Sequence, residues 1–402
     1  MTMNHTDTAR PLINRHQSIA LAIGVLGVVA LGAGFAMDHG HEHFYQSYLL
    51  GFMFWNGITV GFLGLLMLHH MVGGEWGYVN RRFFEAGALC SILMAVLVLP
   101  ILFGGLPHLY EWATQTKVDG DAMLREKAPY LNVNFFYLRV AIYFVFWIGT
   151  SWLLNKWSAD CDRTGTRTFR TKARFLSGPG ILIYVLLYTF YIVDFMMSLE
   201  PHWYSTIFAL LLMVGATLST LSVTANLMNV FRKTEPLAQV MTPNRFWDIG
   251  NLMLAFTMLW AYMGFSQYLI SWAGNLPEDS QFYEHRLMGP WKNLALALVL
   301  LHFAIPFFLL LQRRAKKAPA ALASIGVLLM LMRLVDLYWL IRPSFAGEPA
   351  ANFFWTDLVA PVAIGGVWMA TFYFILKGKA ILPVYETHHD RLPVKSEVYT
   401  HG

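Results

Sequence analysis

The sequence carries little charge. Asp, Glu, Lys and Arg make up 13% of its 402 residues, about half of the roughly 25% found in an average soluble domain. A soluble protein of this length needs more polar surface to cover its core, whereas 56% of these residues are hydrophobic. The composition excludes a disordered chain, a collagen-like fibre and a nucleic-acid-binding domain, and it favours a polytopic membrane protein.

Cysteine is nearly absent as well. Cys90 lies in an apolar run and Cys161 in a basic loop, and they form no CxxC or CxxCH motif. We therefore expect the chain itself to bind no iron–sulfur cluster, zinc ion or c-type haem, and no other metal. Among the histidines only His302 is plainly deep in an apolar run, which argues against the facing histidine pair of a b-type haem.

The sequence contains instead a series of long apolar runs. A helix needs about 20 apolar residues to cross a bilayer, and backbone polar groups in hydrocarbon must pair within their own helix. We predict an all-α integral membrane protein in which one polytopic domain has ten transmembrane helices. The predicted spans lie near residues 18–36, 47–69, 84–104, 133–154, 178–199, 204–227, 248–272, 291–312, 319–342 and 356–377.

Positive charge is unevenly distributed among the predicted loops. With ten spans both termini lie on one side of the membrane, and most of the 29 Lys and Arg residues fall on that side. Because cytoplasmic loops carry an excess of positive charge, we predict that both termini are cytoplasmic. Residues 378–402 are predicted to form a polar, peripheral tail on that face.

Ionisable groups inside the spans are costly and are therefore candidates for function. Most lie toward the predicted outer face, and these are Arg139, Asp194, Glu200, His202, Arg333 and Asp336. The three-residue spacing of Arg333 and Asp336 places them on one helix face, where a structural ion pair is the alternative to a functional role. Asp194 has aromatic and methionine neighbours and no basic residue beside it in the sequence.

A smaller set of titratable groups lies at mid-depth and toward the inner face. Glu85 opens the predicted third span, Asp248 opens the seventh, and His302 lies in the eighth. Pro306, four residues later, should kink that helix. Such groups could carry protons. The alternatives are that the acids cap helix N-termini and that His302 is a core histidine with satisfied hydrogen bonds.

Three stretches that contain several of these residues resemble a known family. They are PYLNVNFFYLR, which ends at Arg139; DFMMSLEPHWYSTIF, which begins at Asp194; and the segment from Asp248 that includes WAY, FSQYLISW and GNLPE. They resemble the second, shorter NrfD-like membrane subunit of alternative complex III, a bacterial quinol:cytochrome c oxidoreductase; this subunit is often called ActF. The resemblance covers roughly residues 130–290 in detail and the rest by topology.

The resemblance implies an architecture and a set of partners. Spans two to five and six to nine would form two four-helix bundles, with the first and tenth helices peripheral. The chain would lie in the bacterial inner membrane with a second NrfD-like subunit, an iron–sulfur subunit, and multihaem and monohaem cytochrome c subunits. Those partners would hold the iron–sulfur clusters and c haems, and menaquinol or ubiquinol would donate electrons. The matched positions are Arg139, Asp194, Glu200, His202 and Asp248.

The expected role is a quinone-site-like pocket, a proton path, or both. The chain holds no electron acceptor, so it would not be active alone. In a pocket, Asp194 or His202 would accept a proton from quinol and Arg139 would orient its oxygen. From the sequence alone, Asp194→Asn should lower turnover and leave assembly intact.

In a proton path, Asp248 and Glu85 would form the inner entry and His302 the middle relay. The outer exit would consist of the acids and the histidine between residues 194 and 202. Two other classes remain open from the sequence, namely a secondary transporter and a purely structural assembly subunit.

Overall fold

The computed structural model describes residues 9–165, 168–345 and 353–383, and this part of the chain is helical with no strand. Ten of its helices are long and apolar enough to cross a membrane, which indicates a multi-pass membrane protein. The predicted all-α class and the predicted number of spans are therefore confirmed for the described residues.

The ten candidate spans follow one another along the chain. They are Arg10–Met37 (α1), Glu42–Val72 (α2), Glu75–Leu109 (α3 to α5), Val133–Thr164 (α8), Phe169–Leu199 (α9 and η3), Phe208–Phe231 (α10), Pro243–Gly274 (α12), Trp291–Leu311 (α14, η4 and α15), Pro319–Phe345 (α17 and η5) and Trp355–Lys377 (α18).

Several spans are built from more than one helical segment. Their parts are α3 (Glu75–Leu89), α4 (Ser91–Leu97), η1 (Ile101–Gly105), α5 (Leu106–Leu109), α9 (Thr168–Phe195), η3 (Met197–Leu199), α14 (Trp291–Ala297), η4 (Leu298–Ala304), α15 (Ile305–Leu311), α17 (Pro319–Ile341) and η5 (Arg342–Phe345). The short connecting helices are η2 (Glu111–Ala113), α6 (Gln115–Gly120), α7 (Ala122–Lys127), α11 (Leu237–Val240), α13 (Pro277–Leu287) and α16 (Arg313–Lys317).

Several helices extend past the predicted spans. The third begins at Glu75 rather than near 84, and the fourth ends at Thr164 rather than near 154. An apolar run marks only the hydrocarbon thickness, whereas a helix continues until the backbone turns. Gly73 and Gly74, with φ of 74° and 99°, separate α2 from α3, and Gly165, with φ of 67°, ends α8. These positive φ values favour glycine.

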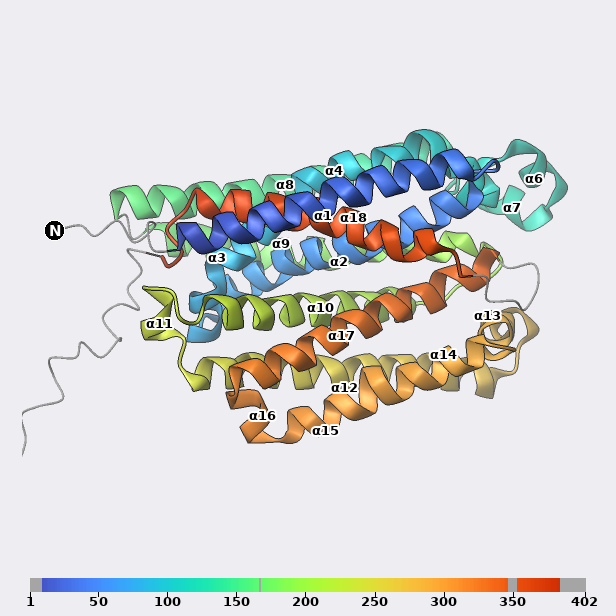
Figure 1. The fold of residues 1–402 in the computed structure, drawn as a ribbon. Coiled ribbons are helices and arrows are strands. Elements are labelled where there is room, and N and C mark those ends of the chain that lie inside the picture. The colour runs from blue at the N-terminus through green and yellow to red at the C-terminus, as the bar shows by residue number, and fades with distance from the viewer. Residues whose placement is uncertain (1–8, 166–167, 346–352, 384–402) are drawn as a thin grey trace, which may run out of the picture.

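Helix contacts are consistent with the two bundles that the resemblance implies. In the first bundle α2, the third span, α8 and α9 contact one another; in the second, α10, α12, the α14–α15 span and α17 do so (Figure 1). The bundles meet where α2 packs against α10 and α17, and α18 lies on α2 with α1 outside it. Gly24 and Gly366 let α1 and α18 approach closely, since a Cβ on Gly24 would lie 2.8 Å from the Val367 nitrogen.

The eighth span is irregular near Pro306, where the sequence predicts a kink. The helix takes a π-helical form over Leu298–Ala304, directly before this proline. Pro306 has no N–H to donate to the carbonyl of His302 one turn earlier, so the regular ladder cannot continue there. His302 therefore lies in the irregular, π-helical part of the eighth span.

The two ends of the molecule carry different connections. Helices α6, α7 and α13 lie at one end, while α11, α16 and the start of α1 lie at the other (Figure 1). The tail is not peripheral from its first residue, because Ile381 and Leu382 are buried and the Pro383 carbonyl accepts a hydrogen bond from the Tyr78 hydroxyl at 3.3 Å. The rest of the predicted tail, 384–402, lies outside the described residues.

Candidate functional site

Arg139 of α8 and Asp194 of α9 form a bidentate ion pair. Nε and Nη2 of Arg139 donate to the two carboxylate oxygens of Asp194 at 2.9 Å each. The Tyr143 hydroxyl donates to the same carboxylate at 2.6 Å, and Nη1 of Arg139 donates to the Tyr130 carbonyl at 2.8 Å. Asp194 is completely buried. Asp194 has no basic neighbour in the sequence, and Arg139 of another helix supplies its counter-charge.

This arrangement leaves the pair with little room for a substrate. Tyr130 and Phe135 cover the guanidinium of Arg139, with ring centres 3.9 and 4.4 Å from its central carbon. A cavity of about 260 Å³ nearby is lined by Tyr130 and Ser198 rather than by the ion pair. Every guanidinium nitrogen already has an acceptor, so the geometry favours a structural role for these two residues.

Glu200 and His202 bind different partners although both lie in the short hairpin turn that joins η3 to α10. Glu200 accepts hydrogen bonds of 2.6 Å from both Arg286 of α13 and the Ser344 hydroxyl. Nε2 of His202 lies 2.9 Å from Asp121, the N-cap of α7. Glu200 therefore ties the hairpin to the second bundle, whereas His202 ties it to the exposed loop.

Local surroundings shift the acid–base equilibria of two groups at this end. Burial lowers the pKa of Arg286, and the Glu200 carboxylate opposes that effect. Partial loss of hydration raises the pKa of Asp121. The backbone N–H groups of Met123 and Leu124, together with His202, lower it by more, so the pKa lies below its usual value. Both groups therefore remain charged at neutral pH, which preserves the two links.

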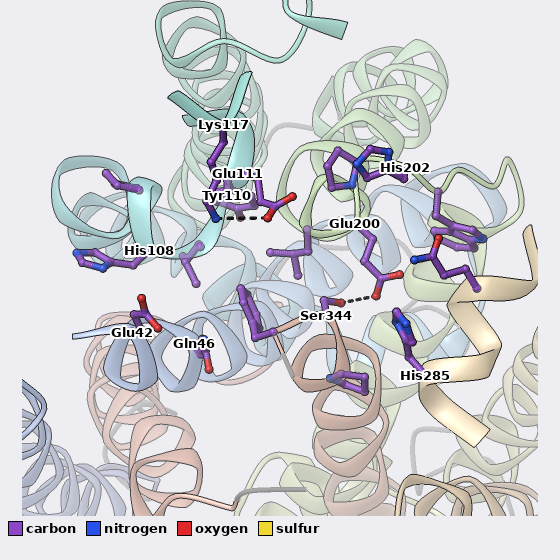
Figure 2. A pocket seen from close by; sticks show the side chains of 18 residues that line it. Glu42, Gln46, His108, Tyr110, Glu111, Lys117, Glu200, His202, His285 and Ser344 are labelled. Carbon is purple, nitrogen blue, oxygen red and sulfur yellow. Dashed lines mark hydrogen bonds and ion pairs between the residues drawn. The ribbon is translucent and has the colours of Figure 1, made fainter. Parts of the chain in front are cut away.

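A polar pocket of about 340 Å³ opens between the bundles at this end (Figure 2). Its labelled residues include Glu42, Gln46, His108, Glu111, Lys117, Glu200, His202 and His285. The glutamates and histidines are spread around the walls, and in the described part of the chain no group of three or more His, Cys, Asp or Glu residues could hold a metal ion. The pocket is lined by polar side chains whose charges are partly paired.

A second buried ion pair lies in the other bundle. Nη1 of Arg333 contacts Oδ2 of Asp336, and Nη2 donates to the Leu212 carbonyl at 3.2 Å. The indole N–H of Trp260 on α12 donates to the same Oδ2 at 3.3 Å. Arg333 and Asp336 are 4% and 3% exposed. The three-residue spacing thus does bring them together on one helix face.

His302 stacks on the indole of Trp260. The ring centres are 4.2 Å apart and the planes differ by 9°. The imidazole is completely buried, and neither ring nitrogen makes a well-formed hydrogen bond, although the backbone of Met332 faces it. Buried polar atoms are normally paired, and the Met332 backbone is the group that faces this imidazole.

A large apolar cavity adjoins this cluster. Its volume is about 660 Å³, and α10, α12, α13, the eighth span and α17 bound it. Trp260 and Asp336 form part of its wall, beside the amide of Gln267. Tyr262 and Phe265 line the cavity and are also 66% and 63% exposed, so the cavity opens on the outside of the bundle. An apolar pocket with a few polar groups is typical of a ligand site.

Glu85 lies at the opposite end of the molecule, at the centre of a buried basic cluster. It accepts hydrogen bonds from Arg82 at 2.8 Å and from the Ser158 hydroxyl at 2.6 Å. Arg81 and Lys379 each approach it to 3.3 Å. Burial lowers the pKa of Lys379, and Glu85 opposes that effect. Glu85 is therefore held as the counter-charge of three cations.

The two acids predicted to open spans lie deeper in their helices. α3 begins at Glu75 and α12 at Pro243, so Glu85 is in the third turn and Asp248 in the second. Neither is an N-terminal cap, because the helices start upstream of the apolar runs. Asp248 is partly exposed and lies 3.4 Å from Arg245. By contrast, a capping role is found at Asp357, which accepts from the Phe354 N–H at 3.0 Å.

The predicted site residues therefore fall into separate clusters. Arg139 pairs with Asp194, and Arg333 pairs with Asp336 beside His302. Glu200 pairs with Arg286, and His202 lies against Asp121. Glu85 pairs with Arg82, and Asp248 pairs with Arg245. In the part of the chain that the structure describes, we find no side-chain hydrogen bond that joins one cluster to the next. The described residues do not form the single continuous ladder that the sequence suggested.

Three contributors to these clusters were missed from the sequence. Tyr143 lies four residues after Arg139, and that spacing places both on one face of α8. Trp260 is part of the WAY segment, where its indole N–H was a possible donor. Arg286 lies between the predicted seventh and eighth spans, and nothing local in the sequence indicates that it is only 1% exposed.

Comparisons with known proteins add no family to this description, since no family model and no curated protein matches the chain. The fold and the buried ion pairs define its class, a helical, multi-pass membrane protein with an apolar cavity beside a titratable cluster.

Proposed function

We propose that the chain is the membrane subunit of a bacterial respiratory quinol:electron-acceptor oxidoreductase of the alternative complex III type, and that its quinone-site-like pocket is the apolar cavity of the second bundle. The observation that carries this proposal is the position of Asp336 and Trp260 in the wall of a laterally open, aromatic cavity. The resemblance of residues 130–290 to the NrfD-like subunit supports it.

The cavity suits the two parts of a quinol. An apolar, aromatic space that opens on the side of the bundle accepts a planar ring and an isoprenoid tail from the bilayer. The ring oxygens require polar partners, which Asp336 and the amide of Gln267 provide. This location differs from the one expected from the sequence, because Asp194 and Arg139 have used their hydrogen-bonding capacity on each other and on Tyr143.

The chemistry assigned to this chain is proton handling. Oxidation of a quinol releases two electrons and two protons, and the iron–sulfur partner subunit would accept the electrons. Asp336 takes the two protons one after the other and passes the first on before it accepts the second; the adjacent Arg333 balances the charged form of Asp336 before each transfer. His302, stacked on the other side of Trp260, is a second titratable group within the same cluster and takes the role of the middle relay.

The remaining parts of the proposal follow from the resemblance and the charge bias. The chain lies in the bacterial inner membrane with both termini cytoplasmic. The end with α11 and α16 faces the cytoplasm, and the end with α6, α7 and α13 faces outward. A second NrfD-like subunit, an iron–sulfur subunit and multihaem and monohaem cytochrome c subunits complete the assembly, and menaquinol or ubiquinol is the substrate.

Filling the cavity should weaken quinone binding without unfolding the protein. Gly264 of α12 lines the cavity, and a Cβ there meets only Leu211, at 3.9 Å. We expect Gly264→Phe to weaken binding of a short-chain ubiquinone or menaquinone analogue by about tenfold or more, because the phenyl ring occupies the ring site. Quenching of tryptophan fluorescence on titration with the analogue measures this effect.

The matched control is Gly149→Phe on α8, where a Cβ meets nothing within 4 Å and the helix is away from the cavity. It should bind the analogue like the unaltered protein. Equal binding by both variants, or no saturable binding by the unaltered protein, would remove the cavity from the proposal.

Membership of a redox assembly is tested by mild purification of the tagged chain from its native membrane. We expect iron–sulfur and haem-containing subunits to co-purify, visible as haem absorbance in the fraction that contains the chain. A lone chain or a homo-oligomer without haem would instead favour the transporter alternative, whatever the outcome of the quinone titration.

A further inference from the structure

The short helix α16 concentrates positive charge at one end of the second bundle. Its five residues, Arg313–Lys317, include four cations. Arg313 and Arg314 are exposed and Lys317 is half-buried. Within the described residues none of the four forms an ion pair, whereas at the same end Arg82 is neutralised by Glu85 and Arg245 by Glu75. No carboxylate of the described residues therefore neutralises the charge of α16.

Contacts with α12 hold these cations in a defined position. The Arg313 guanidinium lies 5.2 Å and the Lys317 ammonium 5.7 Å from the centre of the Trp247 ring. Lys316 points inward and donates to Asn251 at 2.6 Å. Its stem lies against Gly250, where a Cβ would come within 2.7 Å of the Lys316 Cγ. The helix is thus anchored by one lysine, while Arg313 and Arg314 are exposed.

The surface next to α16 is apolar. Phe308 and Leu311 of α15, which directly precede the basic segment, are 64% and 51% exposed. In Figure 1, α16 lies at the end of the bundle that also holds α11 and the start of α1. A tryptophan at the end of a span is typical of the membrane–water interface. An apolar side with fixed cations at its end matches a phospholipid in shape and chemistry.

We propose that α16 and Trp247 form a binding site for the headgroup of an anionic phospholipid. The phosphate lies between Arg313, Arg314 and Lys317, and the acyl chains lie along Phe308 and Leu311. A phosphate accepts hydrogen bonds from guanidinium groups and balances the local charge. This site is separate from the proposed quinone cavity and does not depend on it.

The experiment compares lipid binding by charge-matched variants of the full chain. Purified, delipidated protein in neutral detergent is titrated with cardiolipin or phosphatidylcholine and examined by native mass spectrometry. The test variant is R313Q/R314Q/K317Q. The control is R170Q/K172Q/R174Q, which removes the same charge from exposed positions of α9 that lack a tryptophan platform. A second test variant, Trp247→Leu, leaves the charge unchanged.

We expect the unaltered protein to prefer cardiolipin over phosphatidylcholine. The test variant should lose affinity for cardiolipin on the order of tenfold to a hundredfold, since each basic residue near an anionic lipid contributes about 1 kcal/mol. Trp247→Leu should lose a smaller factor, and the control should bind almost normally. Equal losses of cardiolipin affinity in the test and control variants, or no loss in either, would overturn the proposal. So would an acidic protein that binds at α16 if the test variant keeps its affinity for cardiolipin.

Discussion

Replacement of Arg139 by methionine is expected to destabilise the folded protein by about 3–5 kcal/mol, because it leaves the buried Asp194 carboxylate without a counter-charge. The tyrosine that also donates to this carboxylate cannot neutralise it. The exposed Arg170 of the neighbouring helix is the matched control, and R170M should have little effect. Thermal unfolding of both variants in the same detergent measures the difference.

The double variant R139M/D194L shows how much the whole ion pair contributes to the free energy of unfolding. The single variant shows instead what is lost when one buried charge remains without its partner. Replacing both partners of a buried ion pair by apolar residues is often nearly neutral, so the double variant should recover most of the lost stability. If R139M unfolds like the unaltered protein, the pair is not structural. This geometry also changes the expectation for Asp194→Asn, which should impair folding as well as turnover.

The second large effect is expected at Glu85. Glu85→Gln removes the negative charge shared by Arg81, Arg82 and Lys379, so we expect a loss of about 3–5 kcal/mol of stability. Glu111→Gln is the control, because Glu111 is 48% exposed in its ion pair with Lys117. Such exposed pairs contribute at most about 1 kcal/mol. Unfolding midpoints of the two variants provide the comparison.

Glu85→Gln should also loosen the segment that follows α18, because Lys379 is held by that carboxylate. Limited proteolysis of the variant is therefore expected to cut after residue 377 faster than in the unaltered protein. Asn155 also accepts a hydrogen bond from Lys379. An unchanged midpoint together with unchanged cleavage would show that Ser158 and Asn155 hold the cluster without the charge of Glu85.

The number of helices could be predicted because a bilayer imposes one simple length. Any run of about 20 apolar residues must cross it as a helix, and each of the ten predicted runs lies largely within a helix of the structure. The ends were less predictable. The third helix extends back to Glu75 through polar residues, because only the glycines before it interrupt the backbone.

The candidate site was predictable only where the partners are close in sequence. Arg333 and Asp336 lie three residues apart on one helix, so local geometry alone brings them together. Arg139 and Asp194 could be singled out by their cost in a membrane, but their direct pairing depends on how α8 packs against α9. The same is true of Trp260, which reaches Asp336 from a different helix.

The sequence by itself determined the class of this protein, its ten helices and the buried charges that need a partner, because those features follow from composition and from the hydrocarbon thickness. Only the tertiary structure decided which charges neutralise each other, where Arg286 and Lys379 are buried, and that the large apolar cavity lies beside Asp336 rather than Asp194. Those outcomes depend on contacts between residues tens or hundreds of positions apart, which hydropathy and local spacing do not encode.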